Sequence, residues 1–301
     1  MNPKTLNKEI KLTIFTPAYN RAHTLPRTYY SLKEQDCKDF IWLIVDDGSA
    51  DNTRELVEQW QKEDNGFEIQ YIFKNNGGMH TAHNTAYDNI HTELNTCIDS
   101  DDMLAKNAVR LILDKWEKVK DKGYAGIVGL DIDMNTGKVI GKDFPKDLYE
   151  TTLSGYYEMG GSGDKKQVYR TDIIKKYPKY PVFDGEKYFS LSYKYLLIDQ
   201  EYKLAVINEP LCRVEYQQDG SSNSMLKQYM NNPKGFAEWR RIRLKYDKTY
   251  KRKIIDCIHY CSSCQIGKER KYVKKSPEPL LSFLCIPLGY ILTLYIKKNA
   301  K

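Results

Sequence analysis

Three aspartates, Asp99, Asp101 and Asp102, directly follow the apolar pair Cys97-Ile98. Carboxylates crowded at the end of a buried strand repel one another, so a cation among them would stabilise the cluster. A hard divalent ion held by one or two carboxylates and by phosphate oxygens is the usual solution. The alternative is an Asp-rich turn that begins the next helix, because Asp favours turns and N-caps. The residue types alone leave both explanations open.

Polar residues follow two earlier apolar runs in the same way. Asp46-Asp47-Gly48-Ser49 comes after Phe40–Val45, where a carboxylate suits hydrogen bonds from a base or a ribose. The segment from Pro17 to Arg21 comes after Leu12–Thr16, and it offers an aromatic face for stacking and a cation for phosphate. A turn with an N-cap explains either segment alone. Three successive strand ends with such groups favour a binding site.

The elements that position these residues alternate between short apolar runs and helical stretches. This alternation predicts an α/β fold with a mostly parallel central sheet flanked by helices. Polar loops then follow the carboxyl ends of the strands, where open α/β sheets bind ligands. The expected strands are 12–16, 40–45, 68–73, 95–98 and 126–130, and the expected helices are 21–35, 52–62, 81–90 and 107–120.

Four segments together resemble the inverting family 2 glycosyltransferases of the glycosyltransferase A fold. They are Thr13–Arg21, Trp42–Ser49, Asn76–Asn84 and Cys97–Asp102, the last of which matches the Asp-x-Asp motif. The resemblance covers about residues 10–220 and is strongest up to residue 105. It implies a glycosyltransferase A fold and an enzyme that transfers a hexosyl or N-acetylhexosaminyl group, with inversion, from a nucleotide-sugar donor. UDP is the nucleotide that the resemblance favours.

The resemblance also implies roles for individual residues. Asp101 is the expected direct ligand of Mn²⁺ or Mg²⁺, with Asp99 as its partner in the motif. The metal would neutralise the charge that develops on the leaving nucleoside diphosphate. The positions that match donor-binding residues are Pro17, Tyr19, Arg21, Asp47, Asn76, Asn84 and Asp99.

An inverting transfer needs a general base that takes the proton of the acceptor hydroxyl. The resemblance implies a carboxylate at the start of a helix, well after the metal motif. Glu186 precedes a helical run expected over Tyr188–Leu197, so we expect it to be the base, with Asp184 as the alternative candidate. An acid that merely favours a helix N-terminus is the competing explanation. Asp164, after the Gly-rich loop Gly160–Gly163, is expected to contact the acceptor or the sugar.

The chain departs from the family pattern at two places. Many relatives supply a third metal ligand, often His, late in the catalytic domain, but Glu215–Ser221 contains no His. Asp219 is the expected substitute, with water as the other possibility. Met79 and His80 also stand where a basic residue is common.

The C-terminal quarter carries the positive charge. The net charge is +7, but the segment from Leu226 has 18 Lys and Arg against 5 Asp and Glu. The same segment contains a 17-residue apolar run, Leu280–Ile296, which is interrupted by Pro287 and Gly289. This length is at the lower limit for a membrane span, so we expect an interfacial or re-entrant element that basic residues attract to anionic lipid. A hydrophobic helix packed on the catalytic domain is the alternative.

These features predict two regions. A nucleotide-sugar-binding catalytic domain is expected over residues 1–220, and a helical, basic, membrane-associating region over 221–301. Cys257, Cys261 and Cys264 lie near His259, but their spacing puts them on one helix face, which favours a buried core over a zinc site.

The expected partners follow from the same features. They are a nucleotide-sugar donor, a saccharide or lipid-linked saccharide acceptor, and a membrane surface; the apolar run beside the basic charge favours membrane over nucleic acid. Met1–Lys11 lacks the apolar stretch of a secretory signal, which predicts a cytoplasmic protein, peripheral or monotopic at the inner face of the cell membrane. Surface polysaccharide synthesis is the expected process. The alternative function is a catalytically inactive nucleotide-sugar-binding or membrane-scaffold protein of the same fold.

Overall fold

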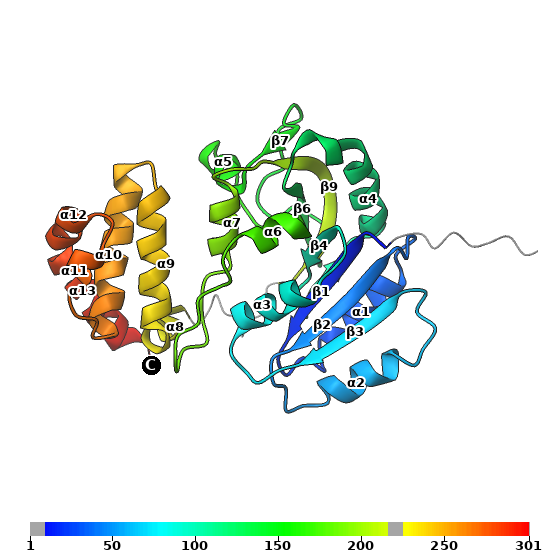
Figure 1. Cartoon of the computed structure of the whole chain (residues 1–301), viewed down its shortest axis with the longest axis horizontal. Coiled ribbons are helices and arrows are strands. Elements are labelled where there is room, and N and C mark those ends of the chain that lie inside the picture. Colours follow the sequence, from blue (N-terminus) through cyan, green and yellow to red (C-terminus); the bar gives the residue numbers. More distant parts are fainter. Residues whose placement is uncertain (1–9, 216–224, 301) are drawn as a thin grey trace, which may run out of the picture. The chain divides into compact units, whose positions relative to one another are not determined.

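A computed structural model of the chain describes residues 10–215 and 225–300 (Figure 1). The strands are β1 Leu12–Ala18, β2 Phe40–Asp46, β3 Glu68–Phe73, β4 Leu94–Cys97, β5 Met103–Leu104, β6 Gly126–Asp133, β7 Glu150–Thr151, β8 Lys165–Arg170 and β9 Leu204–Val214. The helices are α1 Leu25–Lys33, α2 Thr53–Trp60, α3 Met79–Asn89, α4 Ala108–Val119, α5 Leu153–Glu158, α6 Thr171–Lys176, α7 Ser192–Ile198, α8 Met225–Asn231, α9 Pro233–Tyr246, α10 Tyr250–Ile266, α11 Tyr272–Lys275, α12 Pro279–Leu284 and α13 Ile286–Asn299, with a short 3-10 helix at Lys120–Lys122.

The described chain divides into two compact units, which we call the sheet unit and the helical unit. The sheet unit contains the residues up to Asn76, together with Ala82–Lys179 and Lys194–Glu215. The helical unit contains Gly77–Thr81, Tyr180–Tyr193 and the helices α8 to α13. Each unit is described by itself.

The sheet unit is built on one sheet with the strand order β3-β2-β1-β4-β8-β6-β9-β5, and β7 pairs with β9. The pairs β1–β2, β1–β4, β2–β3 and β6–β9 are parallel, while β8 runs antiparallel to both of its neighbours, β4 and β6. The carboxyl ends of β1, β2, β4 and β6 therefore meet the amino end of β8 at one edge of the sheet. The predicted α/β fold with a mostly parallel central sheet is confirmed.

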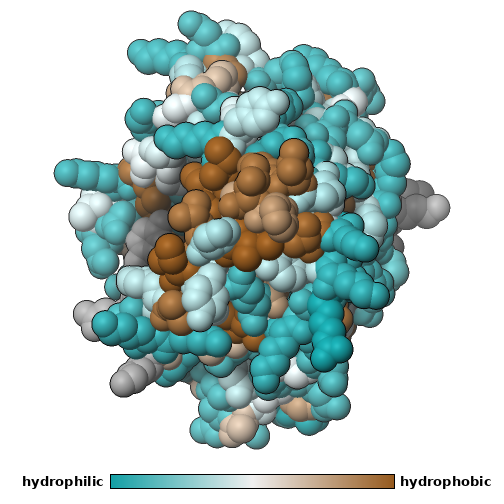
Figure 2. Space-filling view, turned by 90° about the vertical axis from the view of Figure 1, so that its left-hand side faces the viewer, coloured by the Kyte–Doolittle hydropathy of each residue, from teal (hydrophilic) through white to brown (hydrophobic). Residues whose placement is uncertain are grey.

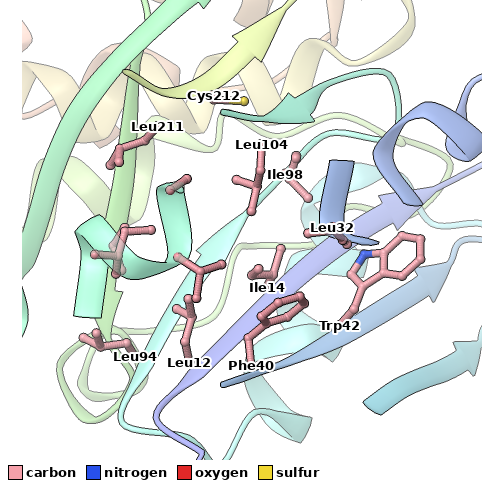
Figure 3. Close-up of a cluster of buried hydrophobic side chains, with 14 of the residues drawn as sticks. Leu12, Ile14, Leu32, Phe40, Trp42, Leu94, Ile98, Leu104, Leu211 and Cys212 are labelled. Atoms are coloured by element: carbon pink, nitrogen blue, oxygen red, sulfur yellow. The ribbon is translucent and has the colours of Figure 1, made fainter. Parts of the chain in front are cut away.

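The core explains why the first strands are continuous apolar runs. Leu12 and Ile14 of β1 and Phe40 and Trp42 of β2 point to the face that α1 covers with Leu32 (Figure 3). On the other face, the ring of Phe15 packs edge-on against residues of α3. Strands buried on both faces need apolar side chains at nearly every position.

One predicted boundary in this unit is wrong. The first helix was expected directly after Asn20, but α1 begins at Leu25, and Pro26 occupies its first turn. Asn20 has a φ of 54°, in the left-handed region, and so cannot continue a helix. The intervening residues form hydrogen bonds to the next loop instead.

The helical unit confirms the expected C-terminal helices. Cys257, Cys261 and Cys264 lie on one face of α10 and are buried together with Cys285. Arg240 of α9 forms an ion pair of 2.5 Å with the fully buried Asp256 of α10, which holds these two helices together. None of the helices within the described residues has the length and apolar character needed to cross a membrane.

Candidate active site

The loops that follow β1 and β2 are tied together by hydrogen bonds. The backbone N–H of Asn20 donates to Ser49 Oγ at 2.8 Å, and the N–H of Ala50 donates to Asn20 Oδ1 at 2.8 Å. The N–H of Ala22 donates to Asp51 Oδ2 at 3.0 Å. The two loops that were predicted to bind the donor therefore form one continuous surface.

The two aspartates at the end of β2 have different partners. Asp46 accepts hydrogen bonds from the Ser49 N–H at 2.7 Å and from the Tyr71 hydroxyl at 2.6 Å. Asp47 is buried and forms an ion pair with Lys74, which follows β3. Asp46 thus shapes the loop, while Asp47 and Lys74 form a charge pair beside it. The sequence interpretation missed Lys74, although a basic residue directly after the third strand was a usable indication.

The remaining residues predicted to bind the donor base lie around this loop. Pro17 is buried in β1. The pairing of β1 with β4 ends at Phe15, two residues earlier, so the missing N–H of Pro17 removes no hydrogen bond between these two strands. Tyr19 is 49% exposed and offers an open aromatic face. A Cβ on Gly48, whose φ is +86°, would lie 2.8 Å from the backbone nitrogen of Asn76, so glycine permits this close approach.

Asn84 and Arg21 lie on two further elements. Asn84 is half-buried on α3. Arg21 is half-buried after β1, and its positive charge acts to lower the pKa of Asp99. This electrostatic effect connects the predicted donor-binding loop with the predicted metal motif.

The acidic motif follows β4 and is held firmly. Thr28 Oγ1 of α1 donates to the carbonyl oxygen of Asp102 at 2.8 Å, and the Asp102 N–H donates to the carbonyl oxygen of Asp99 at 3.0 Å. Burial raises the pKa of Asp99, and Asp101 adds to the rise while Lys166 opposes it. Burial also raises the pKa of Asp102 to about 8, again against the influence of Lys166. The carboxylates are thus crowded and poorly solvated.

Two residues of this cluster were missed in the sequence. Asp131 of β6 is 4% exposed, and its Oδ1 accepts no hydrogen bond from any described residue. Burial raises the pKa of Asp131 to about 6. Burial lowers the pKa of Lys166, but its acidic neighbours Asp131, Asp102 and Asp99 outweigh burial, so the pKa is raised well above its usual value. Its ammonium donates to the carbonyl oxygen of Cys97 at 3.2 Å.

Asp164 lies next to this cluster in an exposed position at the end of the Gly-rich loop. Its charge acts to raise the pKa of Asp131. The loop is fixed by the buried Lys165, whose ammonium donates to the carbonyl oxygens of Ile140 at 3.0 Å and Ser162 at 2.9 Å. The structure therefore brings together Arg21, Asp99, Asp101, Asp102, Asp131, Asp164 and Lys166.

The two candidates for the general base, Asp184 and Glu186, belong to the helical unit. Glu186 was expected at the start of a helix over 188–197, but that helix, α7, begins only at Ser192. The Lys187 N–H donates to Asn232 Oδ1 at 2.8 Å, and this side-chain contact replaces the helical pattern. Asp184 is exposed in the turn before Glu186.

Glu186 lies at the N-terminus of a different helix. Its carboxylate accepts hydrogen bonds from the backbone N–H groups of Lys234 at 3.0 Å and Gly235 at 2.8 Å, in the first turn of α9. These donors have no partner within the helix, and the helix dipole favours a negative charge there. Asp219, the predicted substitute for a third metal ligand, lies outside the described residues.

The acidic cluster fits a divalent cation that is bound partly by protein carboxylates and partly by the phosphate of a substrate. Within residues 10–215 and 225–300, no three His, Cys, Asp or Glu side chains form a group that could hold a metal ion. Mg²⁺ is commonly bound by one or two carboxylates, and substrate phosphates and water supply the other oxygens. Several carboxylates surround one ammonium, and one oxygen of Asp131 is buried without a donor. This surplus of negative charge suits a hard cation at Asp99 and Asp101.

Comparison with known proteins decides the family. The model described as "Glycosyl transferase family 2" matches residues 13–178. The chain belongs to this family. A curated relative from Campylobacter jejuni, a GalNAc(5)-diNAcBac-PP-undecaprenol beta-1,3-glucosyltransferase, is 28% identical over 171 residues, which are 55% of this chain and 53% of the relative. A teichoic acid poly(glycerol phosphate) polymerase of Staphylococcus epidermidis is 33% identical over 35% of this chain and 15% of its own length. The match spans about half of the first relative and less of the second.

Solved structures with low sequence identity share the fold. S. aureus TarS 1-349 in complex with UDP-GlcNAc matches with a TM-score of 0.59 and 16% identity, over 96% of this chain and 92% of that one. The mannosyltransferase PcManGT from Pyrobaculum calidifontis, in complex with GDP-Man and Mn²⁺, matches with a TM-score of 0.55 and 13% identity, over 95% and 88% of the two chains. The predicted family 2 membership and glycosyltransferase A fold are confirmed.

Proposed function

We propose that this family 2 protein is a metal-dependent, inverting glycosyltransferase that acts in surface polysaccharide synthesis. It transfers a hexosyl or N-acetylhexosaminyl group from a UDP-sugar to a saccharide acceptor that is linked to a lipid. The observation that carries the proposal is the acidic cluster around Lys166, at the edge of the sheet where the loops after β1, β2 and β4 meet. The UDP-GlcNAc complex of TarS supports UDP, and the undecaprenol-linked substrate in the name of the C. jejuni relative supports the acceptor class.

The donor site follows from the charges of the sheet unit. The open ring of Tyr19 stacks on the nucleobase, and the loop that contains Asp47, Gly48 and Asn76 surrounds the base and the ribose. Arg21 and Lys166 supply positive charge to the diphosphate. Such preorganised charges stabilise a leaving group without reorganisation during the reaction.

Asp101 and Asp99 would hold Mn²⁺ or Mg²⁺. When bound, the cation supplies the charge that neutralises the leaving nucleoside diphosphate. Two neighbouring residues support this cation site. Thr28 fixes the backbone of Asp102, and Lys166 limits the repulsion among the carboxylates.

We propose Glu186 as the general base, with Asp184 as the alternative. A carboxylate has about four acceptor positions, so the two N–H groups of α9 leave room for an acceptor hydroxyl on Glu186. The same two bonds fix the orientation of this carboxylate. Asp164 lies beside the acidic cluster and is proposed to contact the sugar or the acceptor.

The proposed location is the cytoplasmic face of the cell membrane, where the protein is peripheral or monotopic. This location suits an acceptor whose lipid remains in the bilayer. The basic C-terminal region, with 18 Lys and Arg against 5 Asp and Glu from Leu226 onward, supports it.

The test is a panel of UDP-, GDP- and TDP-sugars, incubated with the protein and a membrane lipid extract in Mn²⁺, in Mg²⁺ and in chelator. We expect turnover of a UDP-sugar that requires metal and that is lost in Asp101→Asn. Nucleotide-sugar binding without any turnover would instead support the inactive binding protein of the same fold.

A further inference from the structure

Helices α12 and α13 carry their large apolar side chains on the outside. Leu280 and Phe283 of α12 are 74% and 61% exposed, and Ile291 of α13 is 62% exposed. Leu284, Leu288, Tyr290, Leu294 and Tyr295 are exposed on the same two helices. Figure 2 shows apolar side chains gathered in one patch with hydrophilic residues around it. We call the eight exposed side chains of these two helices the apolar face.

The opposite face of the same helices packs inside the helical unit and is mixed. Ile296 is buried there and Leu281, Ile286 and Leu292 are partly buried, but the face also contains small and polar residues. Ser282, Gly289 and Thr293 are buried against α10. A Cβ on Gly289 would lie only 2.6 Å from the Cβ of Cys261, so the two helices approach closely. Thr293 Oγ1 lies 3.0 Å from Ser262 Oγ of α10 and within hydrogen-bond distance of the Gly289 carbonyl oxygen, at 2.9 Å.

The outward side of these helices differs from that of a helix on a water-exposed surface. Such a helix turns an apolar stripe to the core and a polar face to the solvent. Small residues and hydroxyl groups between helices, with large apolar residues facing outward, are typical of helices packed in lipid. The large apolar side chains on the outward side therefore indicate a hydrocarbon environment for the apolar face.

The charges beside the apolar face match an anionic surface. Lys297 and Lys298 end α13, and Lys274 and Lys275 end α11, which packs against α12. All four lysines are exposed. Basic residues next to an inserted apolar surface add attraction to anionic headgroups.

The lengths of the two helices decide how they meet a bilayer. The helix α13 has 14 residues and α12 has 6, and a turn at Cys285 separates them. At 1.5 Å per residue, α13 is about 21 Å long, against a hydrocarbon core of about 30 Å. Helices of these lengths fit along one leaflet.

We propose that α12 and α13 form a monotopic docking face, which inserts its apolar side chains into one leaflet of an anionic phospholipid bilayer. This inference deepens the proposed function, because it names the bilayer as the partner that brings the sheet unit to a lipid-linked acceptor. The docking itself involves no nucleotide and no transfer.

The test is co-sedimentation of the full chain with vesicles of phosphatidylglycerol and phosphatidylcholine. We expect Ile291→Glu to weaken vesicle binding about tenfold or more, because it removes an apolar side chain that the leaflet would bury and adds a charge that anionic lipid repels. The matched control is Tyr149→Glu, which places the same new charge on a 72% exposed aromatic residue of the sheet unit and should leave binding unchanged. Replacing Lys297 and Lys298 by Gln should weaken binding on the order of fivefold for each charge, and only for anionic vesicles.

A second measurement uses a substitution that should leave the fold intact. Leu288→Trp exchanges one exposed apolar residue for another, and its fluorescence should be quenched by brominated acyl chains on vesicle binding. The proposal is overturned if the wild type does not bind the vesicles, or if it forms a dimer in solution that Ile291→Glu dissociates, because a second copy would then cover the face.

Failure of this proposal and failure of the proposed function are distinguishable. UDP binding in the presence of Mn²⁺ is measured on the same preparations, without vesicles. A protein that binds UDP but not vesicles overturns the docking face alone, whereas one that binds vesicles but no nucleotide overturns the proposed function alone.

Discussion

The two units of this protein depart in different ways from the usual placement of polar side chains outside and apolar side chains inside. In the sheet unit, Asp102 and Asp131 are buried with raised pKa values, at a cost that a bound cation would relieve. In the helical unit, Leu280 and Ile291 are exposed while Thr293 is buried. Each arrangement is unfavourable in water alone. This difference is why we propose a separate partner for each unit, a metal-bound nucleotide for the sheet unit and a lipid surface for the helical unit.

The largest expected effect concerns the acidic cluster. Asp101→Asn keeps the shape of the side chain but removes the charge that binds the cation, so sugar transfer should fall on the order of a thousandfold. Initial rates at saturating donor and Mn²⁺ measure it. Asp172→Asn, the same change on a surface carboxylate of α6, is the matched control. Equal rates for the two variants would contradict the assignment of the acidic cluster as the metal site.

The next effect separates the two possible roles of Glu186. If Glu186 is the base, Glu186→Gln should lower the transfer rate at least about a hundredfold while donor binding stays unchanged. As a helix cap alone, the change should cost about 1 kcal/mol of stability and leave the rate of the folded protein intact. Urea unfolding and rates, measured on the same samples, decide between the roles. Asp184→Asn is the comparison, and a larger loss in that variant would transfer the role to Asp184.

A smaller effect tests the close helix packing of the helical unit. Gly289→Val places side-chain atoms against Cys261 and against the backbone of Ile258 and Ser262, so it should destabilise the protein by about 1–3 kcal/mol. Leu288→Ser, one residue earlier on the exposed side, should change stability in water by less than about 0.5 kcal/mol. Denaturant midpoints measure both. The reverse ranking would mean that the apolar face is a core surface.

The smallest effect is the dependence of stability on pH. In the folded chain the pKa is about 8 for Asp102 and about 6 for Asp131, against an ordinary value of 3.8. Between the ordinary pKa and each raised pKa, the folded chain therefore binds more protons than the unfolded chain. Stability without metal should therefore fall as pH rises from about 4 to 8, by about 1 kcal/mol or more, equivalent to roughly 2–4 °C in Tm. Thermal unfolding in chelator measures it. Mn²⁺ should reverse the trend, and a metal-free protein that is most stable at pH 8 would contradict it.

The parts of the fold and site that the sequence predicted are local in the chain. The strand 40–45 and the polar loop after it are adjacent, so one apolar run and one aspartate pair were enough to place Asp47 at a strand end. Lys166 and Asp131 reach the acidic cluster only because β8 inserts antiparallel between β4 and β6, with Leu130 opposite Lys165. No local pattern contains that pairing. The position of Asp131, directly after the strand predicted over 126–130, was the available indication.

The helical unit shows a second reason for error. A helical run was predicted from Tyr188 onward, but the ring of Tyr188 stacks on Phe236 and the ring of Phe189 contacts Tyr193. These tertiary contacts hold the segment before α7 in an irregular conformation. The apolar run 280–296 was apparent from composition, whereas the inward direction of Gly289 and Thr293 required the structure.

The most direct test of the central claim is calorimetric titration of UDP into the wild-type chain, in Mn²⁺ and in chelator, and into Asp101→Asn in Mn²⁺. We predict that UDP binds the wild type at least about tenfold more tightly with Mn²⁺, because the cation joins the acidic cluster to the diphosphate, and that Asp101→Asn loses this gain. Equal affinity in all three titrations would contradict the assignment of the cluster as a metal and nucleotide-sugar site.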